Sequence, residues 1–254
     1  MGKALLGIAF SFLFVSLFAP VAAFAKPIAI SKLPYTITIP GQYTLSKSIV
    51  MTTDADGITI NADNVTIDMA GYGITSMASA TSNAGINVGD HTGVKIRNGF
   101  ITGFGYYGIY GNGSQNLSVT NIDIFSNGSA GIYGYSNCNG TSITDCTIRD
   151  NGAGIGINGY ANRVSGCTVN GNTAYGIAND HIYVSGNVVY NNGIGIYIGN
   201  GSARNNYVTN SPGYGISSGG ANCLVEGNVC NGNSPNFDTF PAGATKGLNN
   251  PVTP

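Results

Sequence analysis

Side chains that exchange protons, or that bind sugar hydroxyls and carboxylates, are scarce in this sequence. Only 11 Asp and Glu, 10 Lys and Arg and two His occur among its 254 residues. The repeat spacing described below places a few such residues on one outer face, and we take six as candidate binding residues: Asp68, Arg97, Asp145, Arg163, His181 and Tyr183. Their charged groups suit hydrogen bonds to a sugar or a carboxylate, and a tyrosine ring offers an apolar surface. The alternative is a solvated polar face on which Asp68 and Arg97 form a surface ion pair.

The same residues do not assign a catalytic centre. Glycoside hydrolysis needs two carboxyl groups about 5 to 9.5 Å apart, whereas Asp68 and Asp145 should lie three turns apart, about 14 Å at the spacing of β-strands. Calcium requires several oxygen ligands, and only isolated aspartates stand on this face. Two distant histidines, His91 and His181, make a poor metal site because metal ligands normally cluster. The catalytic residues therefore stay open, no metal site or cofactor is expected, and calcium is an option without a ligand cluster to support it.

An internal repeat positions these residues. Gly-Ile pairs begin at residues 57, 85, 108, 131, 154, 176, 195 and 215, so the first interval is 28 residues and the others are 19 to 23. Periods of this length are typical of a solenoid, in which each repeat packs on its neighbours. Each repeat holds three short runs of alternating apolar and polar residues, which indicates three strands. The sequence thus predicts an all-β fold, a parallel β-helix solenoid of about eight turns.

Two columns of equivalent residues support this fold. The isoleucine of every Gly-Ile pair falls at one position, which predicts an inward stack with a spacing of about 4.8 Å. A second column precedes the next Gly-Ile pair and consists of Asn127, Asn151, Asn172, Asn192, Ser211 and Asn233. We expect these asparagines to take the left-handed conformation of a sharp turn and to hydrogen-bond along the stack.

The repeats divide the chain into four segments. Residues 1–25 contain Lys3, an apolar run and an Ala-Phe-Ala sequence, the pattern of a signal peptide cleaved after Ala25; an uncleaved membrane anchor is the alternative. Residues 26–56 are expected to form an N-terminal cap of strands that protects the exposed edge of the first turn. The β-helix is assigned to residues 57–233, and residues 234–254 form a C-terminal tail. No later stretch is apolar enough to span a bilayer, so no membrane span is expected after cleavage.

Composition excludes several classes of function. Charged residues are 8% of the chain and the formal net charge is -1, so the basic footprint of a nucleic-acid-binding protein is absent. Frequent Ile, Val and Thr argue against disorder. Of the five cysteines, Cys146, Cys167 and Cys230 fall at interior positions, and we expect free thiols.

Repeated phrases link the chain to a known family. SNGSAGIYG, DNGAGIGI, NNGIGIYI and DNVTIDMAGYGI share the patterns NGxxGI and VTIxN. They resemble the right-handed parallel β-helix proteins with PbH1 repeats, the NosD-type and pectate-lyase-like superfamily, over roughly residues 34 to 233. The resemblance implies a right-handed coil. For members that act on polysaccharides it also implies a binding face on the sheet formed by the second strand of each turn, which in this chain carries the six candidate residues.

We therefore expect an exported protein, secreted, periplasmic or at the cell surface, that binds a polysaccharide or glycan on one outer sheet face. Faces rich in Ser, Thr, Asn and Tyr suit neutral sugar hydroxyls. Two alternatives stay open. One is a polysaccharide lyase, hydrolase or epimerase with an unrecognised site, and the other is a structural cell-surface protein without catalysis. No nucleic-acid partner is expected, and the sequence assigns no oligomeric state.

Overall fold

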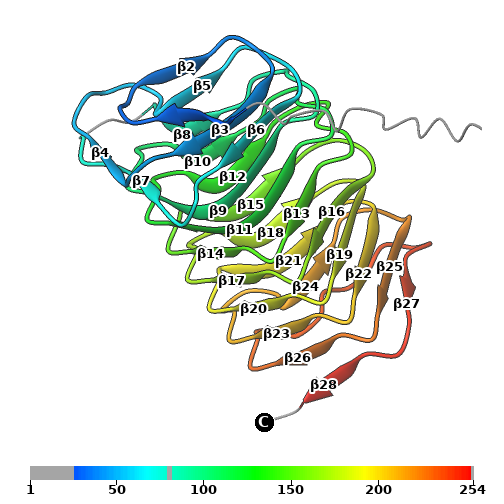
Figure 1. The fold of residues 1–254 in the computed structure, drawn as a ribbon. Coiled ribbons are helices and arrows are strands. Elements are labelled where there is room, and N and C mark those ends of the chain that lie inside the picture. The colour runs from blue at the N-terminus through cyan, green and yellow to red at the C-terminus, as the bar shows by residue number, and fades with distance from the viewer. Residues whose placement is uncertain (1–25, 79–81, 253–254) are drawn as a thin grey trace, which may run out of the picture.

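The chain winds into a coil of stacked β-strands, with the blue N-terminal turns at one end and the red C-terminal strands at the other (Figure 1). The structure is a computed structural model that describes residues 26–78 and 82–252. Its strands pair in parallel throughout this part of the chain. The expected signal peptide, residues 1–25, lies outside the described residues. Within the described residues, no helix is long and apolar enough to cross a membrane.

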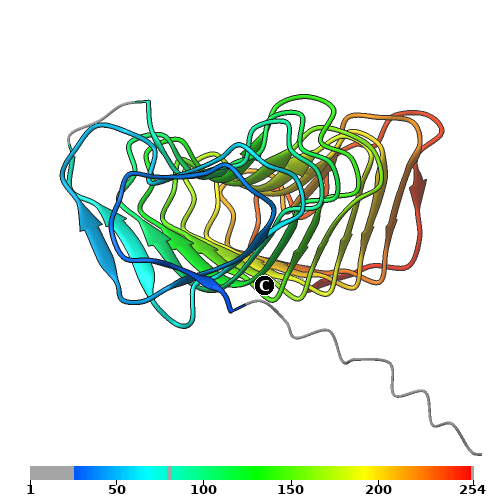
Figure 2. The same cartoon turned by 45° about the horizontal axis from the view of Figure 1, so that its top comes forward.

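The first strand of each turn belongs to a nine-stranded sheet, here called the Gly-Ile sheet. In spatial order it contains β2 (Tyr35–Ile37), β5 (Ile58–Ile60), β8 (Ala84–Asn87), β10 (Tyr107–Tyr110), β12 (Ala130–Gly134), β15 (Ala153–Ile157), β18 (Tyr175–Asn179), β21 (Ile194–Ile198) and β24 (Ile216–Ser218). Figure 2 shows the successive turns one behind another. Nine strands, rather than the eight expected, follow because Tyr35 lies beside Ile58 and adds a turn before the first Gly-Ile pair.

The other two strands of each turn form one 19-stranded sheet, which bends along its length. The second row contains β1 (Ile28–Ile30), β3 (Gly41–Leu45), β6 (Val65–Asp68), β13 (Ser142–Thr144), β16 (Asn162–Ser165), β19 (Ile182–Ser185), β22 (Gly201–Arg204), β25 (Cys223–Glu226) and β27 (Thr245–Lys246). The third row contains β4 (Ile49–Met51), β7 (Gly73–Ser76), β14 (Thr147–Arg149), β17 (Thr168–Asn170), β20 (Val188–Tyr190), β23 (Tyr207–Thr209), β26 (Val229–Asn231) and β28 (Asn250–Val252). Two long strands, β9 (Lys95–Thr102) and β11 (Ser118–Phe125), run through both rows.

The isoleucine column is confirmed. The eight residues Ile58, Ile86, Ile109, Ile132, Ile155, Ile177, Ile196 and Ile216 pair one above the next. Each is at most 1% exposed. A lone isoleucine in a turn of small polar residues cannot bury itself, but in the stack it is covered from both sides.

The glycine of each pair is required by the closeness of the next turn. A Cβ at Gly131 would lie 2.6 Å from the side chain of Ile148 and 2.9 Å from the carbonyl oxygen of Gly154. The same clash with the following turn recurs at the other seven glycines of the series. The Gly-Ile phrase therefore combines one core side chain with one position that admits no side chain.

The asparagine column forms a buried ladder, as expected. The amide Nδ2 of Asn127 donates to Oδ1 of Asn151 at 3.0 Å, and Asn151 donates to Asn172 at 3.1 Å. The expectation that these residues are themselves left-handed is wrong. The positive φ belongs to the residue before each, for example 56° at Asp150 and 55° at Asn191. The bend therefore lies one residue earlier, and the asparagine that follows it supplies the amide of the ladder.

A second ladder lies at the corner between the second and third rows. Asn187 donates to Asn206 and Asn206 to Asn228, both at 2.9 Å. Cys167 occupies the equivalent place one turn earlier, where its backbone nitrogen donates to Oδ1 of Asn187, and Cys146 occupies the place before that. All five cysteines are free and buried.

Both ends of the coil are built as further turns. At the start, β2, β3 and β4 pair with β5, β6 and β7, so the capping segment repeats the geometry of the coil. At the far end the tail pairs β27 with β25 and β28 with β26. Lys246 lies over the ring of Phe237, with its nitrogen 4.3 Å from the ring centroid. The tail thus continues the stack as an incomplete turn.

Candidate functional site

The six candidate residues lie along the second row. Four occupy outward positions of its strands: Asp68 in β6, Arg97 in β9, Arg163 in β16 and Tyr183 in β19. The other two lie just outside strands, since Asp145 directly follows β13 and His181 directly precedes β19. Arg163 and Tyr183 are direct neighbours on adjacent strands.

Asp68 and Arg97 bind each other. They are aligned on adjacent strands, and Nε of Arg97 lies 3.0 Å from Oδ2 of Asp68. Burial opposes ionisation of Asp68, but bonds from the Ala70 amide, Asn98 and Arg97 outweigh it and lower the pKa of this carboxyl. The charges of this pair are therefore satisfied within the protein, which fits the ion-pair interpretation.

Asp145 and His181 are not brought together. Ser142 to Thr144 align with Arg163 to Ser165, and Asn162 aligns with Ile182. Asp145 therefore stands beyond one end of the second-row strands, and His181 stands before the other. A strand length separates the two side chains along the chain direction, in addition to the turns between them.

His181 does meet Tyr183 in a shallow hollow of about 290 Å³ that Tyr160 and Asn200 also line. The imidazole packs on Tyr160 with ring centroids 4.4 Å apart, and its Nδ1 lies 3.3 Å from Oδ1 of the preceding Asp180. The second-row candidates thus form a pair around Asp68 and a separate patch around Tyr183, rather than one convergent site.

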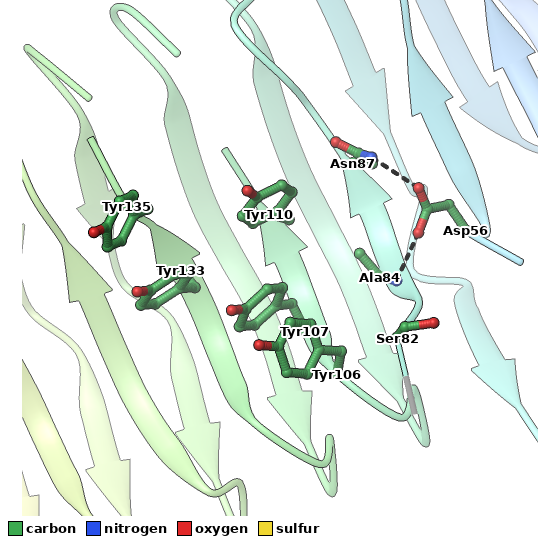
Figure 3. Close-up of a pocket in the computed structure, with 9 residues that line it drawn as sticks. All are labelled: Asp56, Ser82, Ala84, Asn87, Tyr106, Tyr107, Tyr110, Tyr133 and Tyr135. Atoms are coloured by element: carbon green, nitrogen blue, oxygen red, sulfur yellow. Dashed lines mark hydrogen bonds between the residues drawn. The ribbon is translucent and has the colours of Figure 1, made fainter. Parts of the chain in front are cut away.

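A denser group of side chains lies on the outer face of the Gly-Ile sheet. Tyr107 and Tyr110 project from β10 and Tyr133 from β12 (Figure 3). Tyr110 is aligned with Tyr133, whereas the neighbours of Tyr107 are the alanines Ala84 and Ala130. These small residues on either side leave room for the Tyr107 ring to lie against the other two rings.

The three rings are nearly parallel. The Tyr107 centroid lies 5.1 Å from that of Tyr110 and 4.8 Å from that of Tyr133, with interplanar angles of 9° and 10°. The ring of Tyr106 packs on that of Tyr107, with the two centroids 4.0 Å apart. Tyr135 stands beside them and is 63% exposed. Stacked rings of this kind support one another and form a rigid aromatic surface.

These tyrosines border a hollow of about 470 Å³, here called the tyrosine hollow, which is lined by Asp56, Ser82, Ala84, Asn87, Tyr106, Tyr107, Tyr110, Tyr133 and Tyr135. Asp56 comes from the loop before β5 and forms its polar edge. One Asp56 oxygen accepts from the amide of Ala84 at 2.7 Å and the other from Nδ2 of Asn87 at 2.8 Å (Figure 3).

The tyrosine hydroxyls are kept in their neutral form. Burial raises the pKa of Tyr107, Tyr110 and Tyr133 above the ordinary tyrosine value, and neighbouring phenols reinforce the effect. At neutral pH each hydroxyl carries its proton and can both donate and accept a hydrogen bond. The hollow combines flat apolar rings with uncharged polar groups at their edges.

Sequence reasoning did not select these tyrosines. Because Tyr110 and Tyr133 follow the Gly-Ile pair, they fit the ordinary alternation of a strand with one face outward. The available signal was their density, in YYGIYG at residues 106–111 and GIYGYS at 131–136, one repeat apart. Across residues 26–78 and 82–252, no group of three or more His, Cys, Asp and Glu side chains suited to a metal ion occurs.

Comparison with solved structures shows the same fold. Pectate lyase Pel9A superposes with a TM-score of 0.61 and 15% identity, over 87% of this chain and 64% of that chain. A mutant of the periplasmic alginate epimerase AlgG superposes with a TM-score of 0.51 and 12% identity, over 83% of this chain and 69% of that one. The chain thus spans less than two thirds of the length of the pectate lyase.

No curated protein matches the sequence. A family model described as the right handed beta helix region, in contrast, matches residues 37–181, which is more than half of the chain. The match begins in the first complete turn and includes the first six Gly-Ile pairs and the two tyrosine strands, β10 and β12. This chain belongs to the right-handed β-helix family.

Proposed function

We propose that this protein binds a carbohydrate chain, and that the tyrosine hollow is the binding site. The observation that carries the proposal is the aromatic surface itself. Tyr107 is held parallel to Tyr110 and Tyr133 by flanking alanines, on the outside of a rigid sheet. Tyr107 is itself buried, but it supports the half-buried rings of Tyr110 and Tyr133, and Tyr106 and Tyr135 beside them are exposed. A cluster of exposed apolar rings of this kind commonly marks a binding surface.

The chemistry of the hollow matches that of a sugar. A sugar ring has apolar C–H faces, which pack on aromatic rings, and a rim of hydroxyl groups, which need both donors and acceptors. The tyrosine rings supply the first, and their neutral hydroxyls together with Asn87 supply the second. The strands hold these groups in place before the ligand arrives, so little conformational freedom is lost on binding.

Two further observations support a carbohydrate ligand. The solved structures that share this fold include a pectate lyase and an alginate epimerase, both named for polysaccharide substrates. Among the described residues that line the tyrosine hollow, Asp56 is the one carboxylate, and both of its oxygens accept hydrogen bonds from the protein. This arrangement supports binding more directly than acid–base catalysis, which needs a carboxyl group free to exchange a proton.

We also propose that the protein is exported and meets its ligand outside the cytoplasm, as a secreted, periplasmic or cell-surface protein. This rests on the signal-peptide pattern of residues 1–25. Residues 26 onward would then be the working protein, and their coil contains the whole proposed site.

The test compares the two outer faces directly. A glycan-array screen identifies a ligand, and isothermal titration calorimetry measures its affinity for the parent protein and two double variants. Tyr110→Ala with Tyr133→Ala removes two of the stacked rings, and we expect binding at least tenfold weaker, since each such contact contributes about 1 kcal/mol. Arg163→Ala with Tyr183→Ala is the matched change on the second row and should bind like the parent.

Thermal unfolding confirms that both double variants are folded. Loss of binding only in the Arg163 and Tyr183 variant would move the site to the second row, where the sequence had suggested it. Binding of no glycan by the parent protein would contradict the proposal. A reducing-sugar and lyase assay on the same ligand shows whether the bound chain is also cleaved.

A further inference from the structure

The tyrosine hollow continues into a second hollow on the same face. This small-residue hollow, also about 470 Å³, has a floor of Ala153, Gly156 and Ala178 and ends at Tyr175 and Tyr197. Tyr133 and Tyr135 line both hollows. Together the hollows cross six adjacent strands, from β8 to β21, or about 24 Å along the coil axis at the strand spacing.

One outward column explains the shape of this surface. Tyr133, Gly156, Ala178 and Tyr197 are aligned on successive strands. Two large rings therefore stand about 14 Å apart with two small residues between them. Gly156 can accept a side chain, because an added Cβ would make an ordinary contact with its nearest neighbour, the ring of Tyr133 at 3.4 Å. The small-residue hollow is therefore bounded by a tyrosine ring at each end. The tyrosine hollow and the small-residue hollow together are here called the trough, and they form its first and second halves.

Charge is distributed unevenly around this trough. No strand of the Gly-Ile sheet contains a Lys or Arg. The basic residues of the described chain lie instead in the other two rows, as Lys95, Arg97, Arg149, Arg163, Arg204 and Lys246, or in connections near the N-terminal end, as Lys26, Lys32 and Lys47. The charged residues that do line the trough are Asp56 in its first half and Asp180 in its second.

Asp180 is held through one of its two oxygens, whereas both oxygens of Asp56 accept hydrogen bonds. Its Oδ1 accepts from Nδ2 of Asn200 at 2.7 Å and from the amide of His181 at 3.1 Å. Nδ1 of the His181 ring, which lines the separate hollow of Tyr160 and Tyr183, lies 3.3 Å from the same oxygen. A polyuronate carries one carboxylate on each residue. In this trough those carboxylates would lose water without finding a lysine or arginine, and they would face two aspartates.

We infer that the trough accepts an uncharged glycan chain lying along the coil axis and discriminates against polyuronates such as pectate and alginate. This inference rests on the proposed function, because it specifies which carbohydrate the Gly-Ile face takes. It separates the ligand class of this chain from the substrates named for the two solved structures of the same fold. A chain that spans both hollows should also bind more tightly than one that fills only the first.

The experiment uses two length series, neutral oligosaccharides such as glucan, xylan and chitin oligomers and uronate oligomers from pectate and alginate. Calorimetry at low salt should show neutral chains binding with an affinity that rises with length, and uronates at least tenfold weaker. Gly156→Leu fills the second hollow and should remove the gain with length. Ala178→Lys places a cation in the trough and should narrow the gap between the classes, whereas Ser185→Lys on the second row should not.

The possible results separate the two proposals. Uronates that bind as tightly as neutral chains, and lose affinity in the Tyr110 and Tyr133 double variant, would overturn the inference while the proposed site stands. Affinity independent of chain length, with Gly156→Leu unchanged, would overturn the axial path. If neither series binds the parent protein, both the proposed function and the inference fail.

Discussion

At the scale of single residues, Asn172 shows how one side chain joins three turns. Its Oδ1 accepts from the backbone and side-chain nitrogens of Asn151, both at 3.1 Å. Its Nδ2 donates to Oδ1 of Asn192 at 2.9 Å and to the carbonyl of Ile148 at 3.3 Å. All capacity of this amide is used inside the protein, where an unpaired polar group is costly.

Asn172→Ala should therefore lower the free energy of unfolding by about 1 to 3 kcal/mol, because it leaves buried partners on the turns at either side unpaired. Asn170→Ala is the matched control, since Asn170 points outward from β17 two residues earlier. Urea unfolding of the two variants measures the difference. Equal midpoints would mean that water replaces the ladder bonds.

The asparagine column could be predicted because the repeat places amides at one position. Its backbone conformation could not, since Asn occurs both at the bend and after it, as in Asn191-Asn192 and Asn205-Asn206. In these pairs the first residue has the positive φ and the second supplies the ladder amide. The residue type alone therefore does not tell which asparagine forms the bend and which forms the ladder, and the backbone geometry of the turn is needed to decide.

At the scale of elements, strand β15 serves the core with one glycine and the surface with another. Gly154 faces inward, where an added Cβ would collide with the carbonyl of Gly176 and with Val169. Gly156 faces the small-residue hollow, where a Cβ finds ordinary contact distances. Glycine is thus required for packing at position 154, whereas at position 156 it leaves space in the small-residue hollow.

Gly154→Ala should destabilise the protein by about 1 to 3 kcal/mol, because the clash is with backbone that cannot move without disturbing the next turn. Gly156→Ala should be neutral or stabilising by up to about 1 kcal/mol, since alanine loses less freedom on folding. Thermal unfolding of both variants provides the measurement. The steric account fails if Gly156→Ala is the more damaging change.

The same strand shows why the sequence alone did not single out the Gly-Ile face. Charged residues and a histidine are the clearest chemical signals in a sequence with 8% charged residues, and they predict a site on the second row. The tyrosine surface depends instead on what stands between the rings, namely Ala84 and Ala130 beside Tyr107 and Gly156 and Ala178 between Tyr133 and Tyr197. Alanine and glycine have no functional groups that would mark a site in the sequence. The space they leave between the rings becomes visible only once the alignment of the strands is known.

At the scale of the whole molecule, the coil is a one-dimensional stack in which each turn contacts only its neighbours. Fold class and core were predictable from period alone, because the isoleucine spacing fixes which strands pair. Stability in such an array is a sum of turns and the interfaces between them, so the ends have fewer stabilising contacts than the middle. We expect the last turn to be the least stable, since β27 and β28 are short and the described residues add no strand to the Gly-Ile sheet after β24.

The buried thiols report this difference. Cys146 and Cys167 lie in the middle of the coil with complete turns on both sides. Cys223 and Cys230 have a complete turn on one side, whereas on the other side just the short strands β27 and β28 cover them. In native buffer none of the five thiols should react, and after denaturation without reductant all five should. At intermediate urea, mass spectrometry of alkylated peptides should find Cys223 and Cys230 labelled before Cys146 and Cys167. Labelling of all sites at one rate would show that the coil opens as a single cooperative unit, and a shortfall of two thiols would reveal a disulfide.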